Sequence, residues 1–312
     1  MKRYMVMDAH CDTASLLLDR NENLQKNTCH ISLGHLTAFK SYIQFFAAWV
    51  KKEEPEPFGR AMHLLLNVKK EIAKYPDAVC EIRTAGEAEQ VLHDGKIGII
   101  LSMEDGRSLC GSLENLHRFY DLGVRALCLA WNDNNDLTDG AFSAHGNGLT
   151  DFGKKVVAEM NRLHMMVDVS HITEKGFFDV VEISEFPFMA SHANCKSLCD
   201  HQRNLSDEQI RLMIERKCFI GIDLYRPHLS DDGQADIGTV LKHMNHILEL
   251  GGEDILGLGS DFDGMEQLPE GICHVGDYIK LFDEMRKNGY SDVLIDKITH
   301  KNMLDFIKSI EK

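Results

Sequence analysis

Proline, tryptophan and long hydrophobic runs are scarce in this 312-residue chain. Only 6 prolines are present, which leaves no Pro-rich linker or tail. No apolar stretch approaches the roughly 20 residues of a membrane-spanning helix, so we expect no membrane partner. The 9 cysteines are scattered and include no C-x-x-C pair, which argues against a disulfide-stapled secreted domain. Because Asp8 also interrupts the first apolar run before a signal-peptide core forms, we expect a cytoplasmic protein.

Basic residues are also fewer than acidic residues. The chain has 34 Lys and Arg against 49 Asp and Glu, a formal charge of −15, which repels nucleic-acid phosphates and anionic membranes. We therefore expect no nucleic-acid partner. Hydrophobic residues make up 44% of the chain, enough for a large core. Histidine is the abundant type, with 16 residues against 2 tryptophans, and it is the commonest metal ligand and acid–base residue in proteins.

Short apolar runs alternate with amphipathic stretches along the chain. Eight runs are predicted strands, at residues 4–9, 43–50, 97–102, 124–130, 165–170, 186–191, 218–222 and 255–260. Helices are predicted at 58–74, 113–122, 151–163, 173–183, 206–216 and 237–250. Continuous apolar strands that alternate with helices indicate a parallel sheet covered on both faces. Eight units without a phosphate-binding glycine fingerprint predict an α/β fold, a (β/α)8 TIM-type barrel with extra C-terminal helices from Gly276, forming one domain over residues 1–312.

Titratable side chains follow five of the predicted strands. Catalytic residues of such barrels collect at the carboxyl ends of the strands, so these side chains should converge on one mouth. They are His10 and Asp12 after the first strand, Glu104 after the third, His171 after the fifth, His192 after the sixth and Asp261 after the eighth. Imidazole with carboxylate suits zinc or another first-row divalent ion.

Strand alternation and ligand counting divide this set between two ions. His10 and Asp12 point to one face of their strand, whereas Cys11 points away and is expected to be packed. A catalytic zinc usually takes three protein ligands. One ion would take His10, Asp12 and Glu104, and a second ion, about 3.5–4 Å away, would take Glu104, His171 and His192. Two carboxylates then remain. Asp261 is suited to a proton shuttle, and Asp168 to a supporting role or to the barrel interior.

Several of these residues lie in ordered motifs between residues 148 and 264, where a resemblance that covers nearly the whole chain is strongest. The motifs are GLTDFG at 148–153, VDVSH at 167–171, SHAN at 191–194, CDHQRNL at 199–205 and GLGSDFDG at 257–264. In sequence and spacing they resemble the membrane (renal) dipeptidase family, binuclear zinc peptidases of the amidohydrolase-type barrels.

The resemblance implies a role for each matching position. His10 and Asp12 would bind the first zinc, His171 and His192 the second, and Glu104 would bridge both. Asp261 would contact the hydrolytic water and relay its proton. Arg203 would bind the terminal carboxylate of the substrate, for which a guanidinium has the right planar fork. Tyr225 would lie near the substrate, and Asp223 stands where family members often have asparagine. Family members commonly form homodimers.

One position departs from the family pattern. Trp131 occupies the place of a substrate-contacting histidine after the fourth strand. An indole N–H donates a hydrogen bond but does not titrate. Trp131 is therefore expected to line the pocket, to donate one hydrogen bond or to shift the specificity.

The expected function is metal-dependent hydrolysis of a small dipeptide by a hydroxide that bridges two zinc ions, with an L or a D residue at the C-terminal position. One alternative is a barrel amidohydrolase that acts on a cyclic amide or lactone. Such sites often use a carboxylated lysine after the fourth strand, but no lysine lies near Trp131 and Glu104 can fill that role. A catalytically lapsed metal-binding barrel is the other alternative, against which the presence of Asp261 argues.

Overall fold

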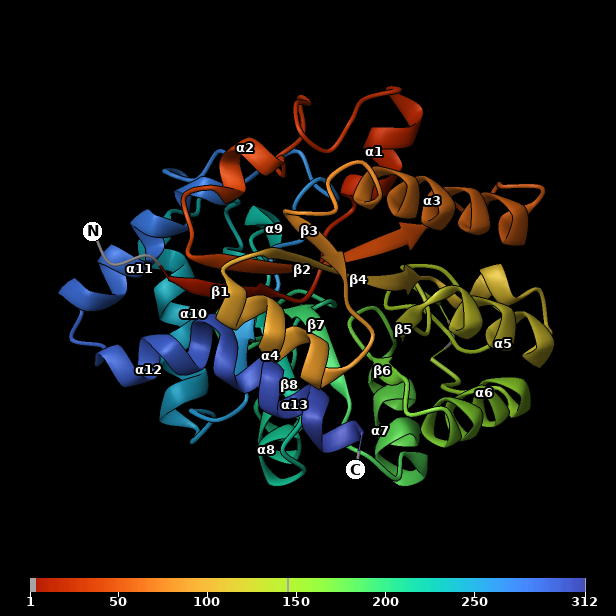
Figure 1. The fold of residues 1–312 in the computed structure, drawn as a ribbon. Coiled ribbons are helices and arrows are strands. Elements are labelled where there is room, and N and C mark those ends of the chain that lie inside the picture. Colours follow the sequence, from red (N-terminus) through yellow and green to blue (C-terminus); the bar gives the residue numbers. More distant parts are fainter. Residues whose placement is uncertain (1–3, 145, 312) are drawn as a thin grey trace.

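The computed structural model describes residues 4–144 and 146–311, and its centre is a closed barrel of eight parallel strands (Figure 1). The barrel strands are β1 (Met5–Asp8), β2 (Ser41–Trp49), β4 (Ile97–Glu104), β5 (Val124–Cys128), β6 (Met166–Asp168), β7 (Met189–Ala193), β8 (Phe219–Ile222) and β9 (Leu256–Leu258). The order around the barrel is β2-β1-β9-β8-β7-β6-β5-β4, and pairing of β2 with β4 closes it. Each of the eight predicted apolar runs overlaps one barrel strand, so the predicted (β/α)8 barrel is confirmed.

A ninth strand, β3 (Val79–Glu81), was not predicted. It pairs only with the beginning of β4, at Ile97–Ile99, while β5 pairs with β4 from Leu101 onwards. β3 and β5 therefore lie along the same edge of β4, with β3 beside its first residues and β5 beside its last residues. Because β3 extends this edge alone, it adds a strand to the sheet without widening the barrel.

Helices surround the barrel (Figure 1). The six predicted helices are present as α3 (Pro57–Ile72), α5 (Leu113–Leu122), α6 (Asp151–Arg162), α7 (Glu174–Ile183), α8 (Asp207–Glu215) and α10 (Ile237–Glu249). Helices that were not predicted are α1 (Thr13–Asp19), α2 (Leu33–Leu36), α4 (Ala85–Asp94), α9 (Arg226–Leu229) and the 3-10 helices η1 (Gly106–Leu109) and η2 (Val275–Asp277). Among the described residues, no helix is long and apolar enough to cross a membrane.

The C-terminal helices pack against the barrel, and the last two of them close one end of it. The C-terminal helices are α11 (Tyr278–Lys287), α12 (Asp292–Asp296), the π-helix η3 (Lys297–Lys301) and α13 (Asn302–Ile310). Met303 and Phe306 of α13 join a buried cluster with Met7 and Phe219 of the barrel strands. The Asn302 amide donates to the carbonyl of Leu256, the first residue of β9. The extra helices predicted from Gly276 are thus present, and α13 covers the end where the strands begin, which leaves the carboxyl ends open for a site.

Candidate metal centre and substrate cavity

The first group of candidate ligands surrounds the Nε2 atom of His10. This atom lies 3.3 Å from Glu104 Oε2, 3.4 Å from Asp12 Oδ2 and 3.8 Å from Asp261 Oδ1. His10 Nε2 and Asp12 Oδ1 are buried without a hydrogen-bond partner in the described part of the chain. Cys11 between them packs in the hydrophobic core, as strand alternation predicted. Buried donor atoms that no protein group satisfies are suited to a cation.

The second group is formed by Glu104, His171 and His192. Glu104 Oε1 lies 2.9 Å from His171 Nε2 and 3.9 Å from His192 Nε2, and the two Nε2 atoms are 2.7 Å apart. All three residues are buried. Glu104 therefore faces His10 with one carboxylate oxygen and the two other histidines with the second, so that the two groups share it.

Hydrogen bonds to the other ring nitrogens select the tautomers of His171 and His192. His171 Nδ1 lies 2.9 Å from Asn132 Oδ1, which only accepts, so this nitrogen carries the proton. His192 Nδ1 lies 2.8 Å from Ser191 Oγ, whose own hydroxyl donates to Asp168. Both Nε2 atoms are then left with a lone pair, which is the form of imidazole that binds a metal.

Asp168 supports this arrangement. Its carboxylate accepts hydrogen bonds from the backbone N–H and the hydroxyl of both Ser170 and Ser191. An Asp168 oxygen also lies within 4.8 Å of ligand atoms of His10 and His192, but three of the four donors occupy Oδ1 and the Ser191 hydroxyl occupies Oδ2. Asp168 thus occupies the supporting position that its place on the strand suggested. Asn132, Ser170 and Ser191 were not predicted, although the Ser-His pair that ends two successive strands was a signal for the serines.

Negative charge is crowded in the first group. Considering protein groups alone, burial and the nearby Glu104 raise the pKa of Asp12 to about 6. Burial, followed by the charge of Asp223, raises the pKa of Asp261 well above its ordinary value. Burial would lower the pKa of His10, but Glu104 and Asp12 outweigh that effect and raise it. A bound cation would oppose these upward shifts in the pKa of Asp12 and Asp261, because it stabilises the ionised carboxylates.

The pKa values of the two imidazoles in the second group are shifted downwards instead. Burial lowers the pKa of His171 and of His192 well below the ordinary value, with nearby cationic groups adding to the effect. Neutral imidazole is the metal-binding form, because a proton on Nε2 would block ligation. By donor type, tautomer and charge, the residues present fit a divalent first-row metal, such as zinc.

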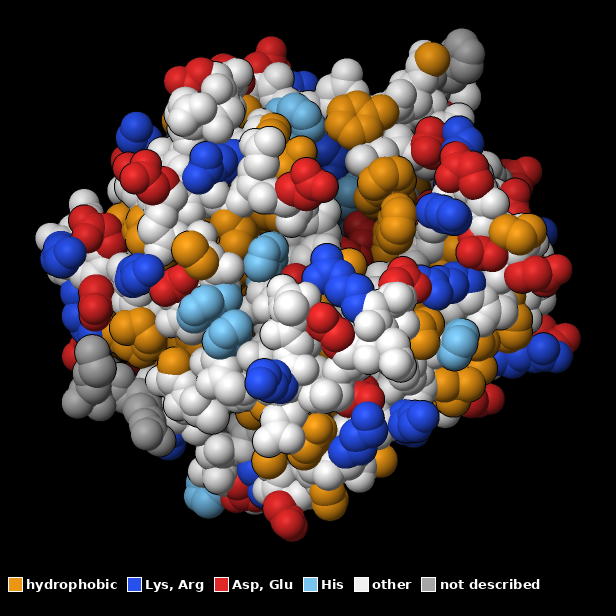
Figure 2. All heavy atoms as spheres, turned by 90° about the horizontal axis from the view of Figure 1, so that it is seen from above, with side chains coloured by type: hydrophobic (Ala, Val, Ile, Leu, Met, Phe, Trp, Pro, Cys, Tyr) orange, Lys and Arg blue, Asp and Glu red, His pale blue; other side chains and the backbone are white. Residues whose placement is uncertain are grey.

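A cavity of about 860 Å³ opens beside these groups, lined by His171, Asp261, Arg203, Trp131 and Tyr225 among others. Figure 2 looks into a hollow on one face of the molecule, with acidic and histidine side chains at its bottom. Arg203 is only 3% exposed. Its Nη2 donates to the His192 carbonyl, but Nε and Nη1 have no partner among the described residues. Unsatisfied guanidinium donors on a residue that lines a cavity are suited to binding a ligand carboxylate.

Trp131 forms part of the cavity wall and also part of a smaller recess of about 270 Å³, which Asp12, Glu104 and Trp49 line as well. The indoles of Trp131 and Trp49 meet edge to face with ring centroids 5.4 Å apart. Trp131 also lies 6.3 Å from the His171 ring. It therefore lines the pocket next to the candidate metal ligands, as its sequence position suggested.

Gly264 lies against the carboxylates of the first group. A Cβ at this position would be 2.3 Å from Asp12 Oδ2 and 2.3 Å from Asp261 Oδ1, so a side chain would displace both. We expect Gly264→Ala to weaken metal affinity roughly 10- to 100-fold, which metal titration and kcat/KM would measure. Gly86→Ala is the matched control, because a Cβ there meets no atom within 4 Å. Metal affinity of Gly264→Ala equal to that of Gly86→Ala would contradict the prediction.

A closed parallel barrel whose strand ends carry two overlapping histidine–carboxylate groups has the architecture of the (β/α)8-barrel metal-dependent hydrolases. Within this class, the sequence profile of the membrane dipeptidase family (peptidase family M19) matches residues 1–312. The chain is therefore a member of the membrane dipeptidase family, which confirms the resemblance carried by its motifs.

Relatives support this assignment over the full chain. Dipeptidase 3 of Mus musculus is 27% identical over 330 residues, covering 100% of this chain and 66% of the mouse protein. A metallo peptidase from Rhodobacter sphaeroides, liganded with a phosphinate mimic of the dipeptide L-Ala-D-Ala, has a TM-score of 0.92 and 28% identity over 99% of this chain and 100% of its own. The dipeptidase AC, a metallo peptidase of family M19, has a TM-score of 0.91 and 30% identity over 99% of both chains. This chain thus spans slightly less than two thirds of the length of the mouse relative.

Proposed function

We propose that the chain is a zinc-dependent dipeptidase. The observation that carries the proposal is the pair of histidine–carboxylate groups that share Glu104 at the edge of a cavity lined by Arg203, whose guanidinium has unsatisfied donors. One structural relative binds a mimic of a dipeptide, and another is itself described as a dipeptidase. A dipeptide has a scissile carbonyl and a terminal carboxylate a few atoms apart, which suits a metal centre and an arginine in one cavity.

Two zinc ions would be held by the two groups. His10, Asp12 and Glu104 would hold one, and Glu104, His171 and His192 the other. When bound, zinc lowers the pKa of a water molecule to about 7 and polarises a carbonyl oxygen. Asn132 and the Ser191–Asp168 pair orient the histidines, so the ligand geometry exists before the substrate arrives.

Arg203 and Asp261 would act on the substrate. Arg203, whose Nη2 also donates to the His192 carbonyl, would bind the terminal carboxylate of the substrate with its guanidinium group, which limits the substrate to one residue beyond the scissile bond. Asp261 would accept the proton of the attacking water and deliver it to the leaving amine. Its side chain is 14% exposed and its Oδ1 lies 3.8 Å from His10 Nε2, so it reaches both the first group and the cavity. Trp131 and Tyr225 would bound the substrate from the walls.

Removal of metal should abolish dipeptide hydrolysis. We expect protein dialysed against a chelator to lose measurable turnover on a library of dipeptides with L and D C-terminal residues, because the proposed nucleophile is a water molecule whose pKa the bound metal lowers. Added zinc should restore turnover as metal content, measured by emission spectroscopy, approaches two ions per chain.

Parallel assays distinguish the remaining possibilities. Full activity in the chelated protein would contradict the metal requirement. Hydrolysis of cyclic amides or lactones without hydrolysis of any dipeptide would indicate the amidohydrolase alternative, and no turnover on any substrate by the metal-loaded protein would indicate a lapsed enzyme. Reconstitution with manganese or cobalt would show whether zinc gives the highest turnover among the metals that such ligands accept.

A further inference from the structure

A second ionic cluster lines the cavity near Arg203. His228 Nδ1 lies 2.5 Å from Asp223 Oδ2, and Asp223 Oδ1 accepts the backbone N–H of Tyr225. Asp223 is fully buried, whereas His228 lines the cavity. His228 is therefore held through Nδ1, and the residue forms part of the cavity lining.

Arg203 and His228 belong to the same end of the cavity. The backbone N–H of Arg203 donates to His201 Nδ1, and the ring centroids of His201 and His228 are 4.4 Å apart. Burial would raise the pKa of Asp223, but His228 and Arg203 outweigh it and hold that pKa below its ordinary value. Burial, together with His228 and Arg203, lowers the pKa of His201 to about 4, so this third side chain is neutral at pH 7.

We propose that His228, held by Asp223, is a specificity residue that selects dipeptides whose C-terminal residue has an acidic side chain. This inference rests on the proposed dipeptidase function. Arg203 has two unsatisfied donors for one carboxylate, and His228 Nε2 supplies a donor for a second carboxylate on the same residue. With Asp223 at Nδ1 and a substrate carboxylate at Nε2, the ring would donate an N–H to each of two carboxylates.

The proposed role of His228 also explains why a carboxylate is buried at position 223. A fully buried carboxylate is costly unless it is paired, and its contact with Nδ1 leaves Nε2 as the ring nitrogen that would meet a ligand. The backbone carbonyl of His228 accepts a hydrogen bond from the Asn204 amide, next to Arg203 in the sequence. The two candidate carboxylate-binding residues are therefore fixed relative to each other.

The test compares two isosteric substrates in the metal-loaded enzyme. kcat/KM is measured at pH 6.5 for Ala-Asp and Ala-Asn, with both stereoisomers of the C-terminal residue. The wild type should prefer Ala-Asp about tenfold, the size expected for one hydrogen bond between charged groups. The double variant Asp223→Asn/His228→Gln replaces the ionic pair by two neutral amides that can still hydrogen-bond to each other. In this variant the two substrates should have about equal kcat/KM, mainly because KM for Ala-Asp rises.

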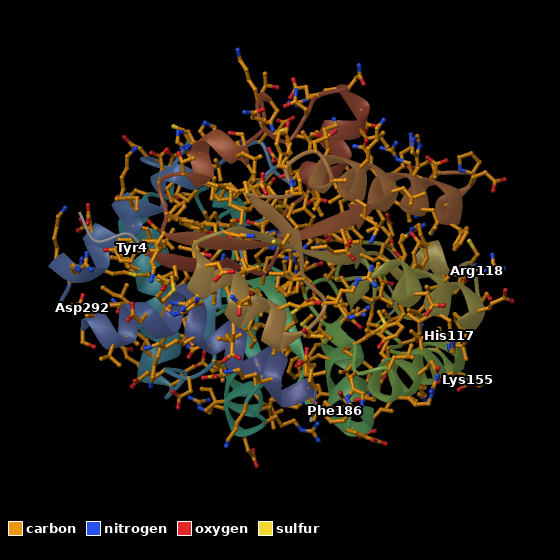
Figure 3. The ribbon with its side chains drawn as sticks, in the orientation of Figure 1. Tyr4, His117, Arg118, Lys155, Phe186 and Asp292 are labelled. Atoms are coloured by element: carbon orange, nitrogen blue, oxygen red, sulfur yellow. The ribbon has the colours of Figure 1, made fainter. Side chains whose placement is uncertain are left out.

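Because the ratio is taken within each protein, a general loss of activity cancels. His117→Gln is the matched histidine control: His117 pairs with Glu159 and lies on the outside of α5, at the periphery of the molecule (Figure 3). Equal rates for the two substrates in the wild type, or an unchanged preference in the double variant, would overturn the specificity inference while leaving the dipeptidase proposal intact. Failure of the wild type to hydrolyse Ala-Ala or any other dipeptide would overturn the proposed function itself.

Discussion

Glu104→Gln should lose bound metal and should hydrolyse dipeptides roughly 1,000-fold more slowly than the wild type, because a bound metal contributes several kcal/mol to stabilising the transition state. Glu104 is the only residue shared by the two ligand groups, with Oε2 directed at His10 and Oε1 at His171. Glutamine keeps the size of the side chain but replaces one of these oxygens by an NH2 group, which donates and does not ligate. At least one ion per chain should therefore be lost.

Metal content per chain after dialysis, measured together with kcat/KM, would check this result. Glu114→Gln is the control, because the Glu114 side chain is 72% exposed on α5 and pairs only with Arg118 on the same helix. The control should keep wild-type metal content and rate. If Glu104→Gln retained two ions and full activity, Glu104 could not be the shared ligand.

The barrel could be predicted because its strands are buried on both faces. Such strands appear in a sequence as continuous apolar runs, and all eight were recognisable. β3 was missed because its three residues include the half-exposed Cys80 and Glu81, and it exists only through pairing with β4. α4 was missed despite clear signals. Thr84 and Glu87 form a capping box at its start, and Gly95 ends it with a φ of +71°.

The candidate ligands could be located because strand ends converge in a barrel, so sequence position alone placed His10, Glu104 and His192 at one mouth. What the sequence could not predict are contacts that depend on the loops between the strands. Asn132 reaches His171 across 39 residues, and Asp223 meets His228 only because a short helix turns the chain back. Neither partner type is unusual in a loop, so their roles appear only in the folded chain.

Asp261→Asn should lower kcat by roughly 100- to 10,000-fold, the usual contribution of a general acid–base residue, while metal content stays at the wild-type value. Asp261 lies in the left-handed backbone region, with a φ of +56°. Asparagine tolerates this conformation better than most residues, so the loop should keep its shape. The amide cannot accept a proton from water at neutral pH, although it can still donate and accept hydrogen bonds.

The combination of lost turnover and retained metal distinguishes proton transfer from ligation. Asp261 Oδ1 lies 3.8 Å from His10 Nε2, farther than the Glu104 and Asp12 oxygens, which is consistent with a group that acts beside the metal rather than on it. Asp254→Asn, at a side chain that is 81% exposed and pairs with Lys297, is the control and should behave as wild type. Wild-type kcat in Asp261→Asn would assign the proton to another group. Loss of one ion together with activity would instead make Asp261 a metal ligand, and the first group would then have four protein ligands rather than three.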